Sequence, residues 1–598
     1  MISMDALAVL QDSFDISLDG NDLVLHPKAA LPEDRSTMYE AMVQIKQHKA
    51  NAVYRLNAPS NAYANIVAFD LETSDLDPLK GEIKLISVWG DGVEKVTSDV
   101  YEVEELLRDP SILKVCHNAS FDVTFLRTKG ITITSYMDTL VMAQVFHNRV
   151  KTDNSLKGLA EKYLGRNLNK NLQHADHWQG DLTEDHYAYA LLDAQVALEL
   201  YYFLQEQITH LHLDVVLKRE MAAIDTIIEL NRNGIGFDYE GWEQELEYMN
   251  TESLQFQETV RNLLETPTLN LQSPAQLMAA LGEQGIHVEG TSDEVLAKYE
   301  GQYDVIDSLR KYKKRRKQIN AYGEKLKQAI GKDGRLRGTW RLMGTDTFRM
   351  TCKQPNLQGM PGKAKPYFRP EEGKSFIVAD YRTIELRILA ELSGDPELKQ
   401  AFYDNEDLHT KTTAAILNKQ EGEMVTAEER KIGKVVNFGL VYGMTKWGLQ
   451  KKIQGATGAA ISLQEAETFR NRYFELYPGV LRYQDRMLQR SFIQTLGGRY
   501  WSDTHHMLEK GSIARYNYPI QATSTEGLKE ALALFLEGRQ KTWKLAAVVH
   551  DEIILEVPDT NIEEASVFLN NVMVEGMKTL VKQIPIEVEL QSAKYWCK

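Results

Sequence analysis

The sequence predicts a multidomain protein that combines α/β and α+β architecture. Its 598 residues exceed what one hydrophobic core normally serves, so several domains are expected. In the first third of the chain, short apolar strands that carry acidic residues alternate with helical segments. Further on, a mostly helical stretch at about 239–330 precedes a buried strand, and at Asp380 this strand is followed by a helix. These three observations indicate the class.

The composition is that of an ordinary globular protein, with 43% hydrophobic and 26% charged residues. No uninterrupted apolar run reaches membrane-spanning length, and the N-terminus does not read as a signal peptide, so no membrane partner is expected. The three cysteines are scattered along the chain, which indicates neither a disulfide framework nor a zinc site. This pattern favours a reducing, cytoplasmic location.

The net charge of −16 is unevenly distributed. Residues 310–365 contain 17 lysines or arginines and only three acids, a local charge of +14, so the rest of the chain carries −30. An acidic protein with one concentrated basic segment is suited to gripping a polyanion in one channel. The alternative interpretation of the run R-K-Y-K-K-R-R-K is a solvated helix face.

Four carboxylates lie in a segment of about 150 residues in the first half. The apolar strand I-V-A-F-D-L-E-T carries Asp70 and Glu72 on one face, because side chains alternate along a strand. Asp122 follows another short strand, and Tyr189 and Asp193 lie four residues apart on a helical run. Carboxylates gathered in this way repel one another unless divalent cations lie among them. Hard oxygen ligands select Mg²⁺ or Mn²⁺.

Two acids in the second half lie at the ends of predicted strands. Asp380 follows the buried run I-V-A, and its alternative role is to cap the helix that stops at Gly394. Asp551 lies at the tip of a hairpin between two apolar runs, where an aspartate is commonly a turn former. The neighbouring Glu552 makes this tip costly without a cation. Both aspartates are therefore candidate metal ligands.

A helix between these acids has an unusual placement of charge. The capping box Thr426-Ala-Glu-Glu429 fixes its start. One stripe recurs at four-residue steps: Arg430, Lys434, Phe438 and Tyr442. Cations in the first turns oppose the usual preference for acids near a helix N-terminus, which predicts a bound polyanion. The alternative is a core helix that is basic and then aromatic.

The N-terminal half resembles a known nuclease family. D-L-E, N-x-x-x-D and Y-A-L-L-D resemble, in order and spacing, the motifs of DEDD-type 3′–5′ exonucleases of the tyrosine-bearing subgroup, which have a ribonuclease-H-like fold. The resemblance implies that two metal ions are held by Asp70, Glu72, Asp122 and Asp193, one to activate water and one to stabilise the leaving oxygen. Tyr189 would orient the attacking water at a single-stranded DNA 3′ end.

The C-terminal part resembles family A DNA polymerases of the bacterial DNA polymerase I type. D-Y-x-x-I-E-L-R, R-x-x-x-K-x-x-x-F-x-x-x-Y-G and V-H-D-E match that family's motifs A, B and C. The resemblance implies a right-hand fold that extends primer–template DNA with dNTPs. Asp380 and Asp551, assisted by the Tyr381 carbonyl, would hold two Mg²⁺ ions while the primer 3′-oxygen attacks the α-phosphate.

Two other functions compete with this interpretation. A single-subunit RNA polymerase shares the metal chemistry, but Glu385 and the complete nuclease set favour DNA synthesis. A nuclease with a non-catalytic, DNA-binding polymerase half would be expected to lose Asp380 or Asp551 first, and the chain retains both.

The resemblance implies further residues around the nucleotide and the DNA. Glu385 would crowd the ribose 2′ position and exclude ribonucleotides, whereas Phe438, which lacks a hydroxyl, would select against dideoxynucleotides. The triphosphate would be bound by His409, Arg430 and Lys434, with Lys434 also counted as catalytic, and Tyr442 would pack on the incoming nucleotide. The expected primer–template contacts are Arg349, Asn356, Gln358, Asn517, Gln521 and His550.

Four positions depart from the family pattern. Arg382 and Thr383 replace the usual Ser-Gln after the motif A tyrosine, and Ile513 stands where an arginine is common. Lys365 takes the place of an arginine that meets phosphate. These departures bear on fidelity and processivity rather than on the reaction class.

The predicted domains follow the motifs. They are an N-terminal segment 1–60 without an assigned role, the exonuclease domain 61–208 and the polymerase domain 209–598, with a thumb at about 240–340, a palm at 341–415 and 516–598, and fingers at 416–515. The first segment suggests a hairpin turn at 18–21 and a short helix at 37–48. No 5′-nuclease domain is expected, so the layout resembles a large fragment or a stand-alone phage polymerase. A monomer in a bacterial or phage-infected cytoplasm is expected, and no replisome partner is indicated.

Overall fold

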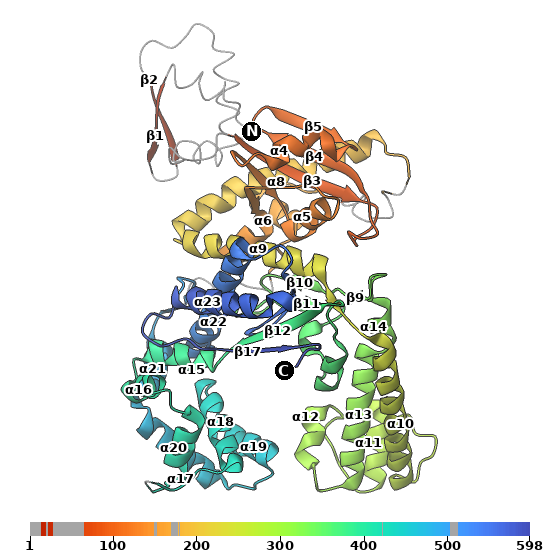
Figure 1. The fold of residues 1–598 in the computed structure, drawn as a ribbon, viewed down its shortest axis with the longest axis vertical. Helices are drawn as coiled ribbons and strands as arrows, with labels where there is room; N and C mark the ends of the chain where they lie inside the picture. The colour runs from red at the N-terminus through yellow and green to blue at the C-terminus, as the bar shows by residue number, and fades with distance from the viewer. Residues whose placement is uncertain are drawn as a thin grey trace.

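The computed structural model describes residues 14–19, 22–27, 65–148, 152–168, 178, 180–420, 422–502 and 512–597. Figure 1 shows a strand-rich domain above a larger domain, whose central sheet is flanked below by two groups of helices. Near the N-terminus, β1 (Phe14–Asp19) and β2 (Asp22–Pro27) pair antiparallel with Asp19 opposite Asp22, which confirms the predicted hairpin. The helix predicted at 37–48 lies outside the described residues.

A five-stranded mixed sheet in the order β5-β4-β3-β6-β7 forms the first domain. The strands are β3 (Asn65–Thr73), β4 (Ile83–Gly90), β5 (Val93–Thr97), β6 (Ile112–Cys116) and β7 (Tyr136–Asp138). β4 runs antiparallel to β3 and β5, whereas β6 runs parallel to β3 and β7. The helices are α4 (Glu104–Arg108), α5 (Ala119–Thr128), α6 (Thr139–His147), α7 (Leu156–Leu159) and α8 (Glu184–His210). This alternation of strands and helices confirms the predicted α/β unit.

The central strand β3 is buried on both faces. Ile66 and Ala68 belong to one hydrophobic cluster, and Val67 and Phe69 belong to another, because successive side chains point to opposite sides of the sheet. A strand with two covered faces reads as a continuous apolar run, which is what the sequence shows before Asp70. The first cluster continues through α9 (Asp214–Asn233) into the second domain, so the two domains share one core.

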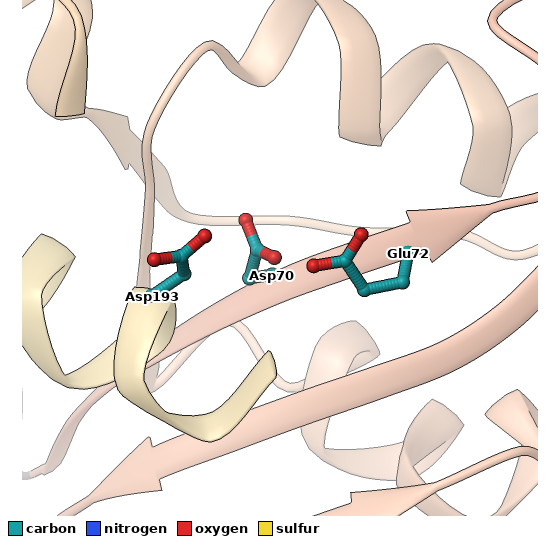
Figure 2. A group of neighbouring side chains, drawn as sticks. All are labelled: Asp70, Glu72 and Asp193. Atoms are coloured by element: carbon teal, nitrogen blue, oxygen red, sulfur yellow. The ribbon is translucent and has the colours of Figure 1, made fainter. Parts of the chain in front are cut away.

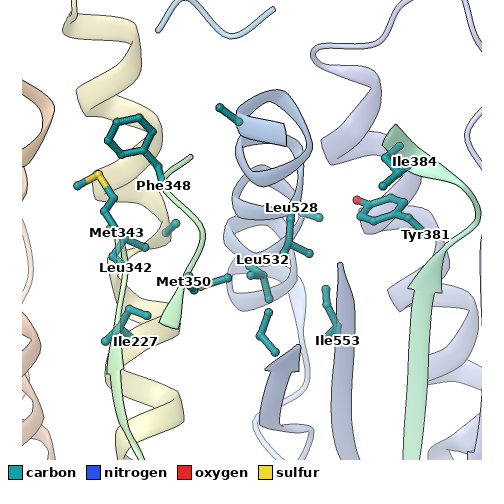
Figure 3. Close-up of a cluster of buried hydrophobic side chains, with 14 of the residues drawn as sticks. Ile227, Leu342, Met343, Phe348, Met350, Tyr381, Ile384, Leu528, Leu532 and Ile553 are labelled. Atoms are coloured by element: carbon teal, nitrogen blue, oxygen red, sulfur yellow. The ribbon is translucent and has the colours of Figure 1, made fainter. Parts of the chain in front are cut away.

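A four-stranded sheet in the order β15-β16-β12-β17 forms the centre of the second domain. Its strands are β12 (Lys374–Tyr381), β15 (Lys544–Val549), β16 (Glu552–Pro558) and β17 (Val588–Ala593), and each neighbouring pair is antiparallel. The helices α15 (Ile384–Ser393), α22 (Ala514–Gly538) and α23 (Ile562–Lys578) accompany it. Figure 3 shows α22 between the loop of Phe348 and the strand of Tyr381, with Leu528 and Leu532 in the buried cluster.

Two groups of helices flank this sheet in Figure 1. One comprises α10 (Tyr239–Leu263), α11 (Pro274–Glu283), α12 (Asp293–Leu296), α13 (Asp304–Tyr322) and α14 (Glu324–Gln328). The other comprises α16 (Pro396–Tyr403), α17 (Leu408–Leu417), α18 (Ala427–Val441), α19 (Lys446–Thr457), α20 (Leu463–Leu476) and α21 (Pro478–Gln489), followed by the hairpin β13 (Phe492–Gln494) and β14 (Tyr500–Ser502). Within the described ranges, no helix combines the length and apolar character needed to cross a bilayer.

The basic segment lies on α13 and the region that follows it, and some of its charge is paired within the protein. Arg310 forms ion pairs with Asp293 and Glu300 at 2.8 and 2.6 Å, and Arg315 pairs with Glu252 at 2.9 Å, so part of the positive charge is used within the protein. Three further side chains of the run are exposed: Lys311, Lys314 and Lys317. These three lysines of the run are exposed to solvent, where an external polyanion could reach them.

Two candidate carboxylate active sites

The first site lies on β3. Asp70 and Glu72 share one face of this strand, and Asp193 on α8 approaches them from the side. One ligand oxygen from each of these three carboxylates lies within 4.8 Å of the others. Figure 2 shows the three side chains turned toward a common region. The structure thus brings together residues 123 positions apart in sequence, as predicted.

Asp122 completes the predicted set of four carboxylates from the first turn of α5. It is 3% exposed, and its Oδ1 accepts a hydrogen bond from the backbone N–H of Leu71 at 3.2 Å. Because Leu71 lies between Asp70 and Glu72 on β3, this bond ties α5 to the strand that bears the other two acids.

A residue that the sequence did not single out holds the start of α5. The buried carboxylate of Asp138 accepts hydrogen bonds from the N–H groups of Asn118, Ala119 and Leu140 at 2.8, 2.9 and 2.8 Å. Asn118 precedes α5 in the left-handed conformation with φ of 76°. Asp138 therefore caps α6 and supports the turn before Asp122. The only sequence signal for it was the aspartate directly before an apolar helical run.

Burial and mutual repulsion dominate the electrostatics of this site. The pKa of Asp70 is well above its ordinary value because the group is buried and faces three other carboxylates. Burial and the charges of Asp193 and Asp122 raise the pKa of Glu72 to about 9. Burial raises the pKa of Asp122 to about 8. Oxygen donors with such displaced pKa values favour a divalent cation.

Tyr189 lies one helical turn before Asp193 and forms a hydrogen bond with it. Burial and the charge of Asp193 raise the pKa of this phenol, which stays protonated. Its ring lies 6.2 Å from that of the buried Trp178. Ser87 of β4 donates to the carbonyl of Ala190 at 2.8 Å and thereby fastens this part of α8 to the sheet.

The second site lies on the four-stranded sheet. Asp380 is paired in register with Glu552, the first residue of β16, so Asp551 at the tip of the β15–β16 hairpin lies next to it. Burial and the charge of Asp380 raise the pKa of Asp551 to about 7. The buried Tyr381 donates its hydroxyl hydrogen bond to the carbonyl of Met573 at 2.6 Å and anchors the end of β12.

The structure excludes the helix-cap alternative for Asp380, because this residue lies within β12 and α15 begins after Thr383, which has φ of 52°. Glu552, next to Asp551, is buried. Its Oε1 accepts a hydrogen bond from the indole N–H of Trp596 at 2.9 Å in a buried environment.

Glu385, the predicted sugar discriminator, is held from two sides. Arg349 donates a hydrogen bond to its Oε1 at 2.7 Å, and the hydroxyl of Tyr442 is hydrogen-bonded to its Oε2. Burial raises the pKa of Glu385, and Arg349 opposes that shift. Arg349, predicted at the primer–template, therefore also fixes the carboxylate of Glu385.

The predicted stripe lies on α18. The capping box of Thr426 and Glu429 is confirmed, and Tyr442 forms the C-cap. Arg430 is exposed and pairs with Asp407 at 2.6 Å, and Lys434 is exposed as well. A surface pair of this kind is worth little and leaves the guanidinium available. The stripe is thus cationic and exposed at its start, which argues against the core-helix alternative.

His409 faces the same helix. Its ring centroid lies 5.7 Å from that of Phe438, and its Nδ1 lies 3.0 Å from Nδ2 of Asn437. Burial and the charge of Arg430 lower the pKa of His409 to about 4, so the imidazole is neutral near pH 7. An amide donor at Nδ1 leaves Nε2 as the protonated nitrogen.

Comparisons with known proteins agree with this architecture. Residues 241–598 match the model of DNA polymerase family A, and residues 41–209 match the 3′–5′ exonuclease model. The chain belongs to DNA polymerase family A. It is 28% identical to DNA polymerase I of Aquifex aeolicus over 88% of this chain and 95% of that protein. It is also 28% identical to DNA polymerase I of Borreliella burgdorferi, over 89% of this chain but only 62% of that protein.

A solved structure shows the same fold. The POL domain of Pol1 from M. smegmatis, in complex with DNA primer-template and dNTP, matches with a TM-score of 0.77 at 22% identity, over 92% of this chain and 98% of that one. The predicted exonuclease-then-polymerase architecture is confirmed. This family A polymerase is a DNA-directed DNA polymerase with a 3′–5′ exonuclease domain, and the alternatives of an RNA polymerase or a non-catalytic polymerase half are not favoured.

Two residues that the resemblance assigned to the primer–template contribute to the fold of the polymerase. Oδ1 of Asn356 accepts from the N–H groups of Gln358 and Gly359 and caps the turn Leu357–Gly359. Nε2 of Gln358 donates to the carbonyls of Met350 and Val548 at 3.1 and 3.0 Å. The stretch 345–361 is therefore not all loop, since it contains this turn and the short strand Thr351–Lys353.

The other predicted DNA contacts lie near the start of α22 and at the hairpin tip. Asn517 is 6% exposed, and among the described residues its amide oxygen has no hydrogen-bond partner. Gln521 lies one turn further along α22, and His550 is exposed beside Asp551 with φ of 58°.

The departures from the family pattern have structural partners in this polymerase. Arg382 pairs with Glu587 at 2.8 Å, and its successor Thr383 has a left-handed backbone. Lys365 lies over the ring of Trp596 at 4.3 Å, and Ile513, just before α22, is 52% exposed. The positive charge of Arg382 and Lys365 is therefore partly engaged within the protein.

Proposed function

We propose that the chain extends the 3′ end of a primer on a DNA template with dNTPs at the Asp380–Asp551 site and removes 3′ nucleotides at the Asp70–Asp193 site. The observation that carries this proposal is that different side chains lie beside each of the two carboxylate clusters. At the Asp380–Asp551 cluster, the neighbouring Glu385 is held by Arg349 and by Tyr442, the C-cap residue of α18. At the Asp70–Asp193 cluster, Tyr189 is hydrogen-bonded to Asp193, and the charges that act on Asp70 and Glu72 are those of other carboxylates.

Both clusters fit hard divalent cations, because their donors are carboxylate oxygens crowded in half-buried positions. Asp380 and Asp551, with the carbonyl of Tyr381, would hold two Mg²⁺ ions in the polymerase site. The exonuclease ions would be held by Asp70, Glu72, Asp122 and Asp193. Mn²⁺ has the same preference for oxygen ligands and would be an alternative. When bound, the ions stabilise charge on the entering and leaving oxygens of an in-line displacement at phosphorus.

The nucleotide is positioned by the chain's own side chains. Arg430 and Lys434 on α18 meet the triphosphate, and Nε2–H of the neutral His409 donates to a phosphate oxygen. Phe438 and Tyr442 pack on the base and sugar. Glu385 crowds the 2′ position, and because Arg349 and Tyr442 hold its carboxylate, it cannot swing aside to admit a ribose.

The exonuclease site binds a single-stranded 3′ end. The protonated hydroxyl of Tyr189 is hydrogen-bonded to Asp193 and orients the attacking water. Asn356, Gln358, Asn517, Gln521 and His550 are proposed to meet the primer–template together with Arg349. The exonuclease domain is assigned to 61–208 and the polymerase domain to 209–598, with the subdomain limits given above. The site of action is the cytoplasm, where DNA and dNTPs are available.

A primed-template extension assay tests the proposal. The expected result is Mg²⁺-dependent extension with dNTPs, little incorporation of rNTPs, and degradation of a single-stranded 3′ end when nucleotides are omitted. The Glu385→Ala variant is expected to lose about a hundredfold of the preference for dNTPs, the scale set by a site built against one hydroxyl. Absence of extension in the unaltered protein, or equal use of dNTPs and rNTPs, would contradict the assignment.

A further inference from the structure

Phe348 has a backbone conformation that bulky residues avoid. Its φ is 60°, in the left-handed region, and its side chain is 2% exposed. The tight loop around it is closed by hydrogen bonds from Phe348 N–H to the carbonyl of Thr345 at 2.9 Å and from Gly344 N–H to the carbonyl of Arg349 at 2.9 Å. Such conformations persist only where the surroundings enforce them.

Two buried cations contact Phe348 directly. Nζ of Lys529, on α22, donates to the carbonyl of Phe348 at 3.0 Å. The guanidinium of Arg499, on the loop between β13 and β14, lies 3.8 Å from the centroid of the Phe348 ring. Both cations are fully buried. Lys529 thus contacts the carbonyl of Phe348 as a hydrogen-bond donor, and Arg499 contacts its ring as a cation–π partner.

The same two cations are fixed by a single buried acid. Glu220 of α9 pairs with Arg499 through Oε1 and with Lys529 through Oε2, each at 2.6 Å. Arg499 also donates to Oδ1 of Asn148, at the end of α6, at 3.1 Å. Elements of both domains therefore position Arg499 and Lys529, which together with Glu220 form what we call the clamp on Phe348. Arg219 and Glu530, which pair at 2.7 Å, lie at its edge.

The residue after Phe348 is Arg349, which donates to Glu385 at 2.7 Å. A change in the backbone of Phe348 would redirect Arg349, because the two residues share a peptide unit. We propose that Lys529 and Arg499 are positioning residues for sugar discrimination, which act through the strained Phe348 to aim Arg349 at Glu385. This inference rests on the proposed function of Glu385 and extends it to residues outside the nucleotide site.

The test compares Lys529→Met with Lys529→Gln. Both substitutions remove the positive charge and introduce side chains of similar size, but only glutamine retains an N–H that can donate to the carbonyl of Phe348. Lys529→Met is expected to lower the ratio of kcat/KM for dNTP over rNTP by about three- to tenfold, the range that one lost hydrogen bond provides, and Lys529→Gln is expected to recover part of it. The rate of 3′ excision from single-stranded DNA should not change. Glu530→Gln, at the edge of the clamp, is the matched control and should leave the ratio unaltered.

A second variant separates positioning from loss of fold. Phe348→Gly accepts the left-handed φ without strain but offers no ring to Arg499, so it is expected to lower the same ratio. Lys529→Met should then have a smaller effect in the Phe348→Gly background, because glycine keeps the left-handed φ without help from the hydrogen bond of Lys529. Additive effects in the double variant, or an unchanged ratio in Phe348→Gly, would overturn the inference. If the unaltered protein extends primers but does not discriminate between the sugars, the proposed role of Glu385 fails instead.

Discussion

The exonuclease and polymerase sites solve the same chemical problem with different amounts of negative charge. The exonuclease site gathers four carboxylates, three of which have ligand oxygens within 4.8 Å of one another. The polymerase site has two, and its nearby third acid, Glu385, is engaged by Arg349 and Tyr442.

The displaced pKa values follow this difference. Burial and carboxylate neighbours raise the pKa of Glu72 to about 9, whereas burial and Asp380 raise the pKa of Asp551 to about 7, a rise that a backbone hydrogen bond and, less strongly, Arg349 oppose. The exonuclease site thus contains a full set of four carboxylates, whose negative charge we expect bound cations to balance. The polymerase site has fewer anions and has cations nearby, which suits the triphosphate of the dNTP substrate that we propose for it. We therefore expect the two sites to differ in their tolerance of losing a ligand and in their response to metal removal.

The largest expected effect is at the polymerase site. Asp551→Ala leaves a single aspartate, Asp380, so extension is expected to fall by about a thousandfold or more, since metal-assisted charge stabilisation is worth several kcal/mol. Single-turnover extension of a primed template measures the loss. Glu552→Gln is the matched control: this adjacent acid bonds to Trp596, and its variant should extend normally. Extension by Asp551→Ala at the normal rate would remove Asp551 from the metal site.

A smaller loss is expected at the exonuclease site. Asp70→Ala leaves three carboxylates, Glu72, Asp122 and Asp193, so excision of a mismatched 3′ end should fall by about a hundredfold rather than disappear. Extension by the same protein should be unchanged. Equal losses at the two sites would contradict the comparison, and loss of both activities in Asp70→Ala would indicate a folding defect.

The smallest expected effect is on stability without metal. The folded-state pKa of Glu72, about 9, and of Asp122, about 8, are raised, so the folded protein binds more protons than the unfolded chain at intermediate pH. The free energy of unfolding in EDTA should therefore fall as pH rises from the ordinary carboxyl range through about 8 to 9. Calorimetry at pH 6 and pH 9 is expected to show a Tm lower by a few degrees at pH 9.

Added Mg²⁺ should restore this Tm at pH 9, because an ion that binds only the folded state stabilises it. Glu72→Gln should flatten the pH dependence in EDTA. Asp551→Asn should alter it only up to about pH 7, where the weaker shift of Asp551 ends. A pH dependence that Glu72→Gln leaves intact would show that the exonuclease carboxylates are not its source.

The local sequence pattern was enough to predict the arrangement of residues that lie on a single helix or strand. The alternation along β3 placed Asp70 and Glu72 on one face, and the four-residue steps on α18 placed Arg430 and Lys434 on one exposed side. It left open whether Asp380 caps the following helix, and the turn at Thr383 excludes this because it separates the strand from the helix. It gave no sign of the partner of Glu552, because Trp596 lies 44 residues away.

The sequence by itself predicted which residues carry the chemistry, because the proposed metal ligands and phosphate-binding cations lie in compact motifs with fixed spacing. Only the tertiary structure decided how those residues are held. Arg349 reaches Glu385 across 36 residues, Tyr442 reaches it across 57, and Lys529 reaches Phe348 across 181. Such contacts join helices, strands and loops that are distant in the sequence, and their packing depends on the whole core rather than on any local periodicity.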